Sequence, residues 1–332
     1  MLTSELDYEL PEALIAQQPA QPRDSSRLMV IDVREGSIAH HVFRDLPAFL
    51  RPRDALVLNE TKVLPARLVA HKGSGGEVEL LFLTDLGGPW EVLARPSRRL
   101  KPGMVLAVSG EELKVVESLG DGRWVIEGSD LPGTMERSGR MPLPPYIRPT
   151  ASAERAYQTL YARNPGSAAA PTAGFHFTEE VLDRAGRAGA RIVRVTLHVG
   201  TGTFAPIRAQ KLEEHEMHAE HYSIPESAAR TVENAGRVVA AGTTVARTLE
   251  TWALTGEREG ESRLFIYPGY GWRAVDVLLT NFHLPRSTLL AMVMSFGGRE
   301  LVREAYRVAV EERYRFYSFG DAMLLLGGGR YR

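Results

Sequence analysis

The 332-residue sequence predicts an α/β fold in which a mostly parallel sheet, covered by helices, is interrupted by a small inserted β-barrel. Three observations support this prediction. Apolar, strand-like runs alternate with helical segments near the start of the chain and again after about residue 150, as in α/β proteins. Between these regions, short β-prone runs are broken by glycines. The length also exceeds what one compact core usually holds, so we expect two domains.

The first strands of the sheet are expected before residue 60. Residues 11–18 are typical of a short helix that ends before a proline, because proline disrupts a helix interior. Residues 26–32 and 54–59 are apolar runs of strand length, and residues 45–50 would form a helical turn. The continuous apolar run at 54–59 indicates a strand that is buried on both faces.

The inserted barrel is expected at residues 60–148, which leaves residues 1–59 and 149–332 as a discontinuous catalytic α/β domain. Glycine-containing turns separate its β-prone runs, a spacing that favours a small closed or nearly closed barrel. These runs are residues 66–70, 77–83, 104–108 and 123–126. The proline-rich stretch at 141–146 would form a stiff, extended connection back to the larger domain.

The remainder of the chain returns to alternating strands and helices. Strands are expected at residues 191–199, 237–241 and 275–280, and helices at residues 178–188, 287–296 and 299–313, with a further helix after residue 242. Such alternation implies a largely parallel sheet with helices on its faces.

Composition and charge exclude several classes of protein. The chain has no cysteine, which excludes disulfides, thiolate nucleophiles and cysteine-bound zinc or iron–sulfur clusters. The formal net charge is −1, whereas proteins that coat nucleic acid without specificity are usually basic. Any RNA contact would therefore use a local patch and a defined pocket. With no basic signal region and no long apolar run, we expect a cytoplasmic protein.

Candidate chemistry lies in three segments that follow expected strands, where ligands bind in open α/β sheets. These segments are residues 196–204, 241–244 and 280–288. In the first segment, glycines alternate with threonines at Gly200, Thr201, Gly202 and Thr203. Glycine lets a backbone approach a ligand closely, although a plain tight turn would give the same pattern. Thr243 and Thr244 could hold a carboxylate or only cap the following helix.

Three histidines belong to these regions or precede a helix. His176 lies just before the helix at 178–188, His198 ends a strand and His283 lies in the loop after another strand. A single histidine among apolar neighbours is usually structural, but three near one ligand-binding edge favour acid–base chemistry. His215, His218 and His221 are spaced three apart and could share one helical face. They lack the zinc-protease spacing, so we expect no metal.

A basic segment in the expected barrel is a candidate RNA contact. It contains Arg95, Arg98, Arg99 and Lys101. Cations of this kind can hold RNA phosphates, although a basic loop without any partner is equally common.

Seven blocks of the sequence resemble the S-adenosylmethionine:tRNA ribosyltransferase-isomerase family. They are DYELP at 7–11, LNETKV at 58–63, PLPPYI at 142–147, APTAGFHFT at 170–178, TLHVGTGTF at 196–204, TNFHLPRST at 280–288 and FGDAML at 319–324. They extend almost from end to end of the chain. Departures are mild, since the family more often has Asp at Glu60, Arg at Lys62 and Lys at Arg286.

The resemblance implies the reaction as well as the α/β domain with its inserted barrel. The ribosyl part of S-adenosylmethionine would move to 7-aminomethyl-7-deazaguanine at the tRNA wobble position and rearrange, giving epoxyqueuosine, adenine and methionine. S-adenosylmethionine would then be a consumed substrate, with no further cofactor. The other partner would be a tRNA with a GUN-type anticodon that carries the precursor base, and we expect a monomer.

This reaction needs groups that exchange protons near neutral pH. We therefore expect His176, His198 and His283 to share the acid–base steps. The expected S-adenosylmethionine contacts are Gly174, Gly200, Thr201, Gly202, Thr203 and Asn281. The basic segment of the barrel would hold tRNA phosphates. Two alternatives remain open on the sequence, an S-adenosylmethionine-dependent RNA methyltransferase and a non-catalytic RNA-binding protein; a metal hydrolase built on the His215 region is a distant third.

Overall fold

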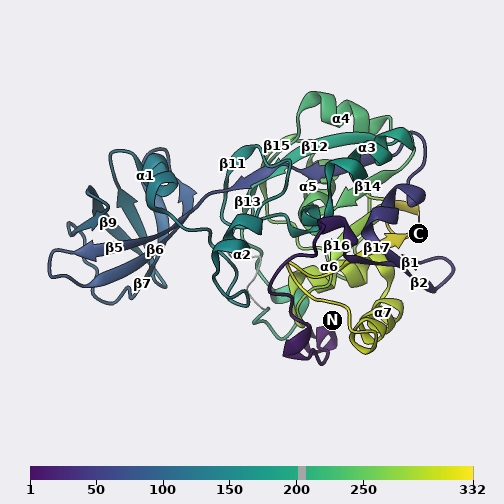
Figure 1. Ribbon diagram of the computed structural model, residues 1–332, viewed down its shortest axis with the longest axis horizontal. Helices are drawn as coiled ribbons and strands as arrows, with labels where there is room; N and C mark the ends of the chain where they lie inside the picture. Colours follow the sequence, from purple (N-terminus) through teal and green to yellow (C-terminus); the bar gives the residue numbers. More distant parts are fainter. Residues whose placement is uncertain (201–206, 332) are drawn as a thin grey trace.

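The computed structural model describes residues 1–200 and 207–331. In Figure 1 a larger α/β part, which includes the N-terminal residues and the last strand, lies beside a separate β-barrel drawn in blue. The predicted α/β fold with an inserted barrel is confirmed.

The larger part is organised around one mixed sheet, which has nine strands within the described residues. Its order is β15-β13-β12-β3-β14-β16-β17-β1-β2. The strands are β1 (Arg27–Asp32), β2 (Ser37–Val42), β3 (Ala55–Asn59), β12 (Arg191–Leu197), β13 (Glu220–Ser223), β14 (Val238–Ala241), β15 (Glu259–Ser262), β16 (Val277–Asn281) and β17 (Ala322–Leu326). The central run from β12 through β3 and β14 to β16 is parallel, as is β17 beside β1. The β16–β17 pairing and the pairings at both edges are antiparallel.

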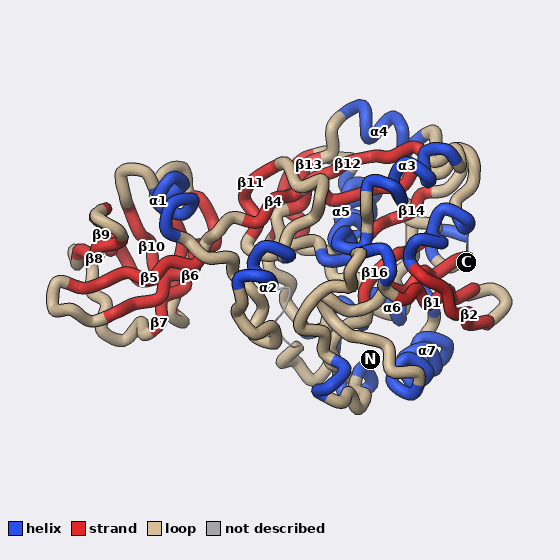
Figure 2. Tube along the Cα trace, in the orientation of Figure 1, coloured by secondary structure: helices blue, strands red, loops and turns tan. Residues whose placement is uncertain are grey.

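Helices and turns cover both faces of this sheet (Figure 2). One face packs against α4 (Glu226–Glu233), α5 (Thr243–Thr255), α6 (Thr288–Gly297) and α7 (Arg299–Glu311). The other face packs against α3 (Glu179–Arg187) and the 3-10 segment Phe43–Phe49. Alternate residues of one strand serve the two cores: in β3, Val57 faces the first and Leu56 the second. Each such buried side chain contributes roughly 2 kcal/mol. Among the described residues, no helix is both long and apolar enough to cross a membrane.

The barrel is closed and antiparallel, with the strand order β10-β7-β6-β5-β8-β9. Its strands are β5 (Arg67–Lys72), β6 (Glu77–Asp85), β7 (Trp90–Arg95), β8 (Val105–Val108), β9 (Glu111–Gly120) and β10 (Arg123–Glu127). Inward side chains alternate with outward ones along β6, as the period of two requires. The helix α1 (Leu131–Ser138) adds Leu131 and Met135 to the barrel core.

Short elements join the barrel to the sheet domain. The chain leaves along β4 (Thr61–Val63), which pairs in parallel with β11 (Asn164–Ser167) on the returning segment. The return passes beside Arg67, which forms an isolated bridge with Arg140, and then enters α2 (Ala151–Ala156). The proline-rich stretch after Arg140 contains no regular element, in agreement with the extended connection expected there.

The expected helix at residues 11–18 is wrong. The structure has only a 3-10 turn, Glu12–Leu14, after which Ile15 forms an isolated bridge with Phe316. Tertiary pairing with the C-terminal region therefore overrides the weak local helix signal in a segment this short.

Candidate active site

The carboxyl ends of the parallel strands β3, β12, β14 and β16 meet at one edge of the sheet. Asn59, the last residue of β3, connects this edge to its neighbours. Its side-chain amide donates to the carbonyl of Leu197 at 3.0 Å and to Oγ1 of Thr244 at 3.3 Å. Its Oδ1 accepts from the backbone N–H of Leu197 at 3.1 Å. Asn59 was not among the predicted site residues, although an asparagine at the end of an apolar strand could have indicated such a role.

His176 is buried in this region, and both of its ring nitrogens are bonded. Nδ1 lies 2.7 Å from Oγ of Ser26, and Nε2 lies 3.0 Å from Nδ2 of Asn281. Oδ1 of Asn281 accepts from Thr172, so its Nδ2 faces the histidine as a donor. Nε2 of His176 must therefore accept, which requires a neutral ring with its proton on Nδ1. Burial, together with nearby arginines, lowers the pKa of His176 to about 3.

His283 is also buried, but it lies among other neighbours. Its Nε2 is 2.8 Å from Oγ1 of Thr280, and its backbone N–H donates to the hydroxyl of Tyr306 at 3.0 Å. Burial lowers the pKa of His283 to about 3. Phe43 stacks on His176 and belongs to the core beneath α3, whereas Tyr306 belongs to the opposite core. Within the described part of the chain, His176 and His283 bond to different partners and not to each other.

His198 follows β12 and differs from the other two because it is only partly buried. Its Nδ1 lies 2.8 Å from Oγ1 of Thr61 at the start of β4. The ring stacks on His221 of β13, with ring centroids 6.2 Å apart. Burial, and then the neighbouring His221, lower the pKa of His198. The structure thus pairs His198, an expected acid–base residue, with His221, which was not among the expected site residues.

The group His215, His218 and His221 is not on a helix. His215 follows the 3-10 turn Leu212–Glu214, and His221 is part of β13. Among the described residues, no set of three His, Cys, Asp or Glu side chains is placed to hold a metal ion.

The expected S-adenosylmethionine contacts fall in different environments. Asn281 is buried beside His176. Gly174 is required by packing, because a Cβ added there would lie 2.3 Å from the hydroxyl oxygen of Tyr161. The backbone N–H of Gly200 donates to Oε1 of Glu220 at 2.8 Å. Thr201, Gly202 and Thr203 lie outside the described residues.

A buried ion pair lies next to Gly200 and was not predicted. Glu220 of β13 pairs with Arg247 of α5, and both are about 5% exposed or less. Gly242, which joins β14 to α5, has a φ of +109°, a conformation that glycine adopts without strain. Thr243 and Thr244 follow it, but neither caps the helix through its side chain, since the N-cap Gly242 has no side-chain cap bond. The signal missed was Arg247, a cation close to a helix N-terminus, where the helix dipole disfavours it.

Glu60 lies at the join between β3 and β4 and is 8% exposed. Its Oε1 accepts from Nδ2 of Asn164 at 3.2 Å, and its Oε2 is 3.9 Å from Nη1 of Arg194. Oε2 has no hydrogen-bond partner among the described residues. The carboxylate can therefore accept a further bond.

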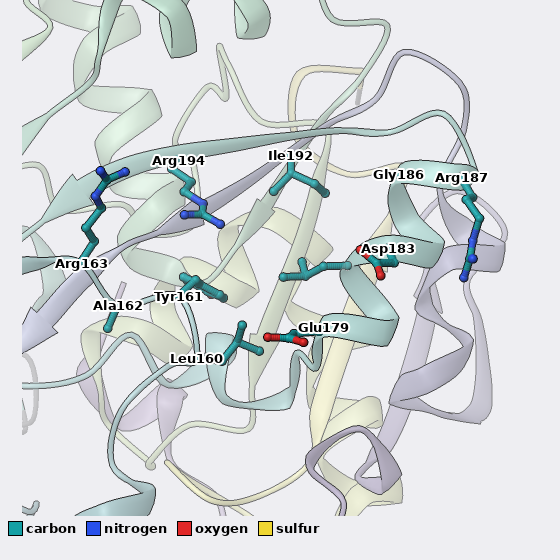
Figure 3. Close-up of a pocket in the computed structure, with 11 residues that line it drawn as sticks. Leu160, Tyr161, Ala162, Arg163, Glu179, Asp183, Gly186, Arg187, Ile192 and Arg194 are labelled. Carbon is teal, nitrogen blue, oxygen red and sulfur yellow. The ribbon is translucent and has the colours of Figure 1, made fainter.

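An open groove of about 1030 Å³ lies between α3 and the outer side of β12. Figure 3 shows Arg163 and Arg194 near one wall, with Glu179 and Asp183 on the helix opposite. Charges of both signs line it, so it is not a simple anion-binding surface. It approaches the carboxyl edge of the sheet at Arg194, next to Glu60.

The basic segment of the barrel is exposed. Arg95, Arg98, Arg99 and Lys101 are all exposed, and none has a carboxylate within ion-pair distance in the described residues. Two positions on β6 show which way this segment runs. Arg95 of β7 lies opposite Glu79 of β6, whereas Arg67 of β5, which is next to the connection with the sheet domain, lies opposite Leu81 of β6. The segment therefore continues from β7 in the direction away from that connection.

Comparison with known proteins gives an independent line of evidence. Residues 3–325 match a family model described as "Queuosine biosynthesis protein". A Rubrobacter xylanophilus protein named S-adenosylmethionine:tRNA ribosyltransferase-isomerase is 72% identical over 331 residues, with 99% of each chain covered. A protein of that name from Anaeromyxobacter dehalogenans is 51% identical and covers 98% of this chain and 99% of its own length. A crystal structure of S-adenosylmethionine tRNA ribosyltransferase from Thermotoga maritima is 38% identical, with a TM-score of 0.57, and covers 97% of this chain and 100% of its own.

Proposed function

The chain belongs to the S-adenosylmethionine:tRNA ribosyltransferase-isomerase family, and we propose that its reaction takes place at the carboxyl edge of β12, β3, β14 and β16. The enzyme transfers and isomerises the ribosyl part of S-adenosylmethionine onto 7-aminomethyl-7-deazaguanine at the tRNA wobble position, giving epoxyqueuosine-tRNA, adenine and methionine. Neither methyl transfer nor a non-catalytic RNA-binding role receives support from the relatives.

The hydrogen bonds of Asn59 are the main support for placing the reaction at this edge. Asn59 bonds to Leu197 and Thr244, and so ties the end of β3 to the residue before His198 and to the start of α5. The buried charges Glu220 and Arg247 lie beside the same edge. Polar side chains that converge where parallel strands end are the usual ligand site of an open α/β sheet.

The three histidines have different roles in this proposal. His198 exchanges protons, because it is the partly buried one and can lie against a substrate. His176 stays neutral and orients Asn281, since a proton on its Nε2 would face the amide donors of that asparagine. His283 also stays neutral and positions the loop after β16 through Thr280 and Tyr306.

Substrate contacts follow from the same arrangement. S-adenosylmethionine contacts Asn281 and Gly200, and we extend this proposal to Thr201, Gly202 and Thr203, which lie outside the described residues. Gly174 supports the site through its packing on Tyr161. S-adenosylmethionine is a consumed substrate, and we propose no further cofactor. The carboxylate of Glu60, which can accept another hydrogen bond, is available to the aminomethyl group of the precursor base.

For the RNA, we propose a tRNA with a GUN-type anticodon and a monomeric enzyme. The wobble base belongs to a single-stranded loop, so extruding it costs little. The exposed cations Arg95, Arg98, Arg99 and Lys101 have no acidic neighbour within ion-pair distance in the described residues and would hold tRNA phosphates.

A product assay tests the proposed function. The protein is incubated with S-adenosylmethionine and a GUN-anticodon tRNA that carries the aminomethyl precursor. The tRNA is then digested, and the masses of its nucleosides are measured by mass spectrometry. We expect free adenine, free methionine and an epoxyqueuosine nucleoside in equal amounts. S-adenosylhomocysteine would instead indicate methyl transfer. Unreacted tRNA that still binds the protein would indicate a role without catalysis.

A further inference from the structure

A narrow pocket opens beside the buried Glu220–Arg247 pair. It is lined by Met217, Glu220, Thr243, Thr244, Arg247 and Met292, and by further side chains that are mostly apolar. The polar side chains come from β13 and the starts of α5 and α6, and the remaining walls are apolar. Its free volume is about 20 Å³. Two of the lining residues are methionines, whose unbranched side chains can change conformation to make room for a ligand.

On one wall of this pocket, positively charged groups have fewer hydrogen-bond acceptors than they can bind. The helix α5 is 13 residues long, has no side-chain cap and has no acidic residue in its first turn, so its positive end is not neutralised by its own sequence. Arg247 adds a cation one turn further along, and its Nε has no hydrogen-bond partner among the described residues. An anion that enters here would meet both groups.

Glu220 supplies the opposite charge a short distance away. Its carboxylate accepts from the backbone N–H of Gly200 and pairs with Arg247. Burying two such charges costs several kcal/mol, and a buried ion pair is weak evidence for stability. A buried Arg–Glu pair in a pocket wall is therefore better explained by what it binds.

We propose that this pocket holds the methionyl end of S-adenosylmethionine. Its α-carboxylate binds Arg247 and the N-terminus of α5, and its α-ammonium binds Glu220. Adenine and ribose are neutral and would not interact strongly with two buried opposite charges. The amino-acid end, in contrast, is a zwitterion with an apolar chain. The apolar walls, including Leu264, Ile266 and Met292, hold that chain. This inference rests on the proposed function, because it takes S-adenosylmethionine as the substrate.

The test compares S-adenosylmethionine with its decarboxylated form, which keeps the ammonium, sulfonium and adenosyl groups. Both are titrated calorimetrically into the protein in complex with a tRNA transcript whose wobble base is unmodified guanine, so that no transfer occurs. For the wild type we expect roughly 100-fold tighter binding of S-adenosylmethionine, the range that charged hydrogen bonds support. In Arg247→Met the ratio should fall to a few-fold.

Two further variants guard against misfolding. The double variant Glu220→Gln/Arg247→Met removes both buried charges together, which proteins often tolerate, and it should also lose the preference. Arg247→Lys keeps the charge and should keep an intermediate ratio. The matched control is Arg237→Met, which breaks the buried pair with Asp54 at the opposite end of β14 and should leave the ratio unchanged.

The outcomes separate the two proposals. An unchanged ratio in both the single and the double Arg247 variants would overturn the pocket assignment, even if adenine and methionine are still released by the wild type. A ratio that collapses only in these variants supports the assignment, whether or not the product assay detects transfer.

Discussion

The buried histidines predict a specific loss of stability in mild acid. His176 and His283 each have a pKa of about 3 in the folded protein, against about 6.5 when unfolded. The unfolded chain therefore binds more protons than the native one once the pH falls below about 6.5. Stability is fully present above that value and is lost as the pH falls toward about 3.

The size of the effect follows from proton linkage. Between about pH 7.5 and pH 5, each histidine that charges only in the unfolded state costs about 2 kcal/mol of unfolding free energy. Two such residues cost about 4 kcal/mol, a large part of a typical domain stability of about 5–15 kcal/mol. His176→Gln removes one of them, so about half of the loss should disappear.

Urea unfolding followed by circular dichroism at the two pH values measures this. Stability at neutral pH is expected to drop in His176→Gln, because the bonds to Ser26 and Asn281 change, but the pH dependence should flatten. His218→Gln is the control, since His218 is exposed in the same domain and its replacement should leave the pH dependence as in the wild type. Equal pH dependence in the wild type and His176→Gln would refute the assignment of His176 as a buried neutral group.

Three other predictions concern the site and the RNA. His198→Gln should lower kcat at least about 100-fold, the contribution of a positioned acid or base, with little change in the S-adenosylmethionine dissociation constant; an unaltered kcat and pH–rate profile would remove His198 from the chemistry. Gly174→Ala should destabilise the protein by about 1–3 kcal/mol, because its methyl group meets the Tyr161 hydroxyl; a melting temperature equal to that of the wild type would contradict the packing argument. Replacing Arg98 and Arg99 together by serine should raise the tRNA KM and flatten its dependence on salt, while S-adenosylmethionine affinity stays the same; an unchanged salt slope would separate the segment from RNA binding.

Much of the sheet could be predicted because burial on two faces leaves a plain sequence signal. The apolar runs of β1, β3, β12, β14 and β16 were all expected, as were α3, α6 and α7. The strands at the edges were not expected. In β2 none of the six side chains is buried, and β13 and β15 are short and contain charged residues. The pairing of these strands therefore depends on neighbours far away in the chain.

The sequence indicates where the candidate histidines lie but not how deeply each is buried. Sequence placed His176, His198 and His283 after strands or before a helix, and all three are near the carboxyl edge. It could not tell their burial apart, because burial depends on Phe43 and Tyr306, which are distant in sequence. Glu220 was not among the expected site residues, since its burial becomes evident only when β13 lies beside α5.

The strand β13 shows how one short edge element can supply two parts of the site. It pairs antiparallel with β12, so that Tyr222 lies opposite Leu197. Because successive side chains point to opposite faces, Glu220 is buried against Arg247 while His221 stacks on His198. A register shift of one residue would exchange these faces, placing a carboxylate beside the histidine and an imidazole in the pocket. The register of β13 therefore determines the charge of the proposed methionyl pocket and the neighbour of the proton-exchanging histidine together.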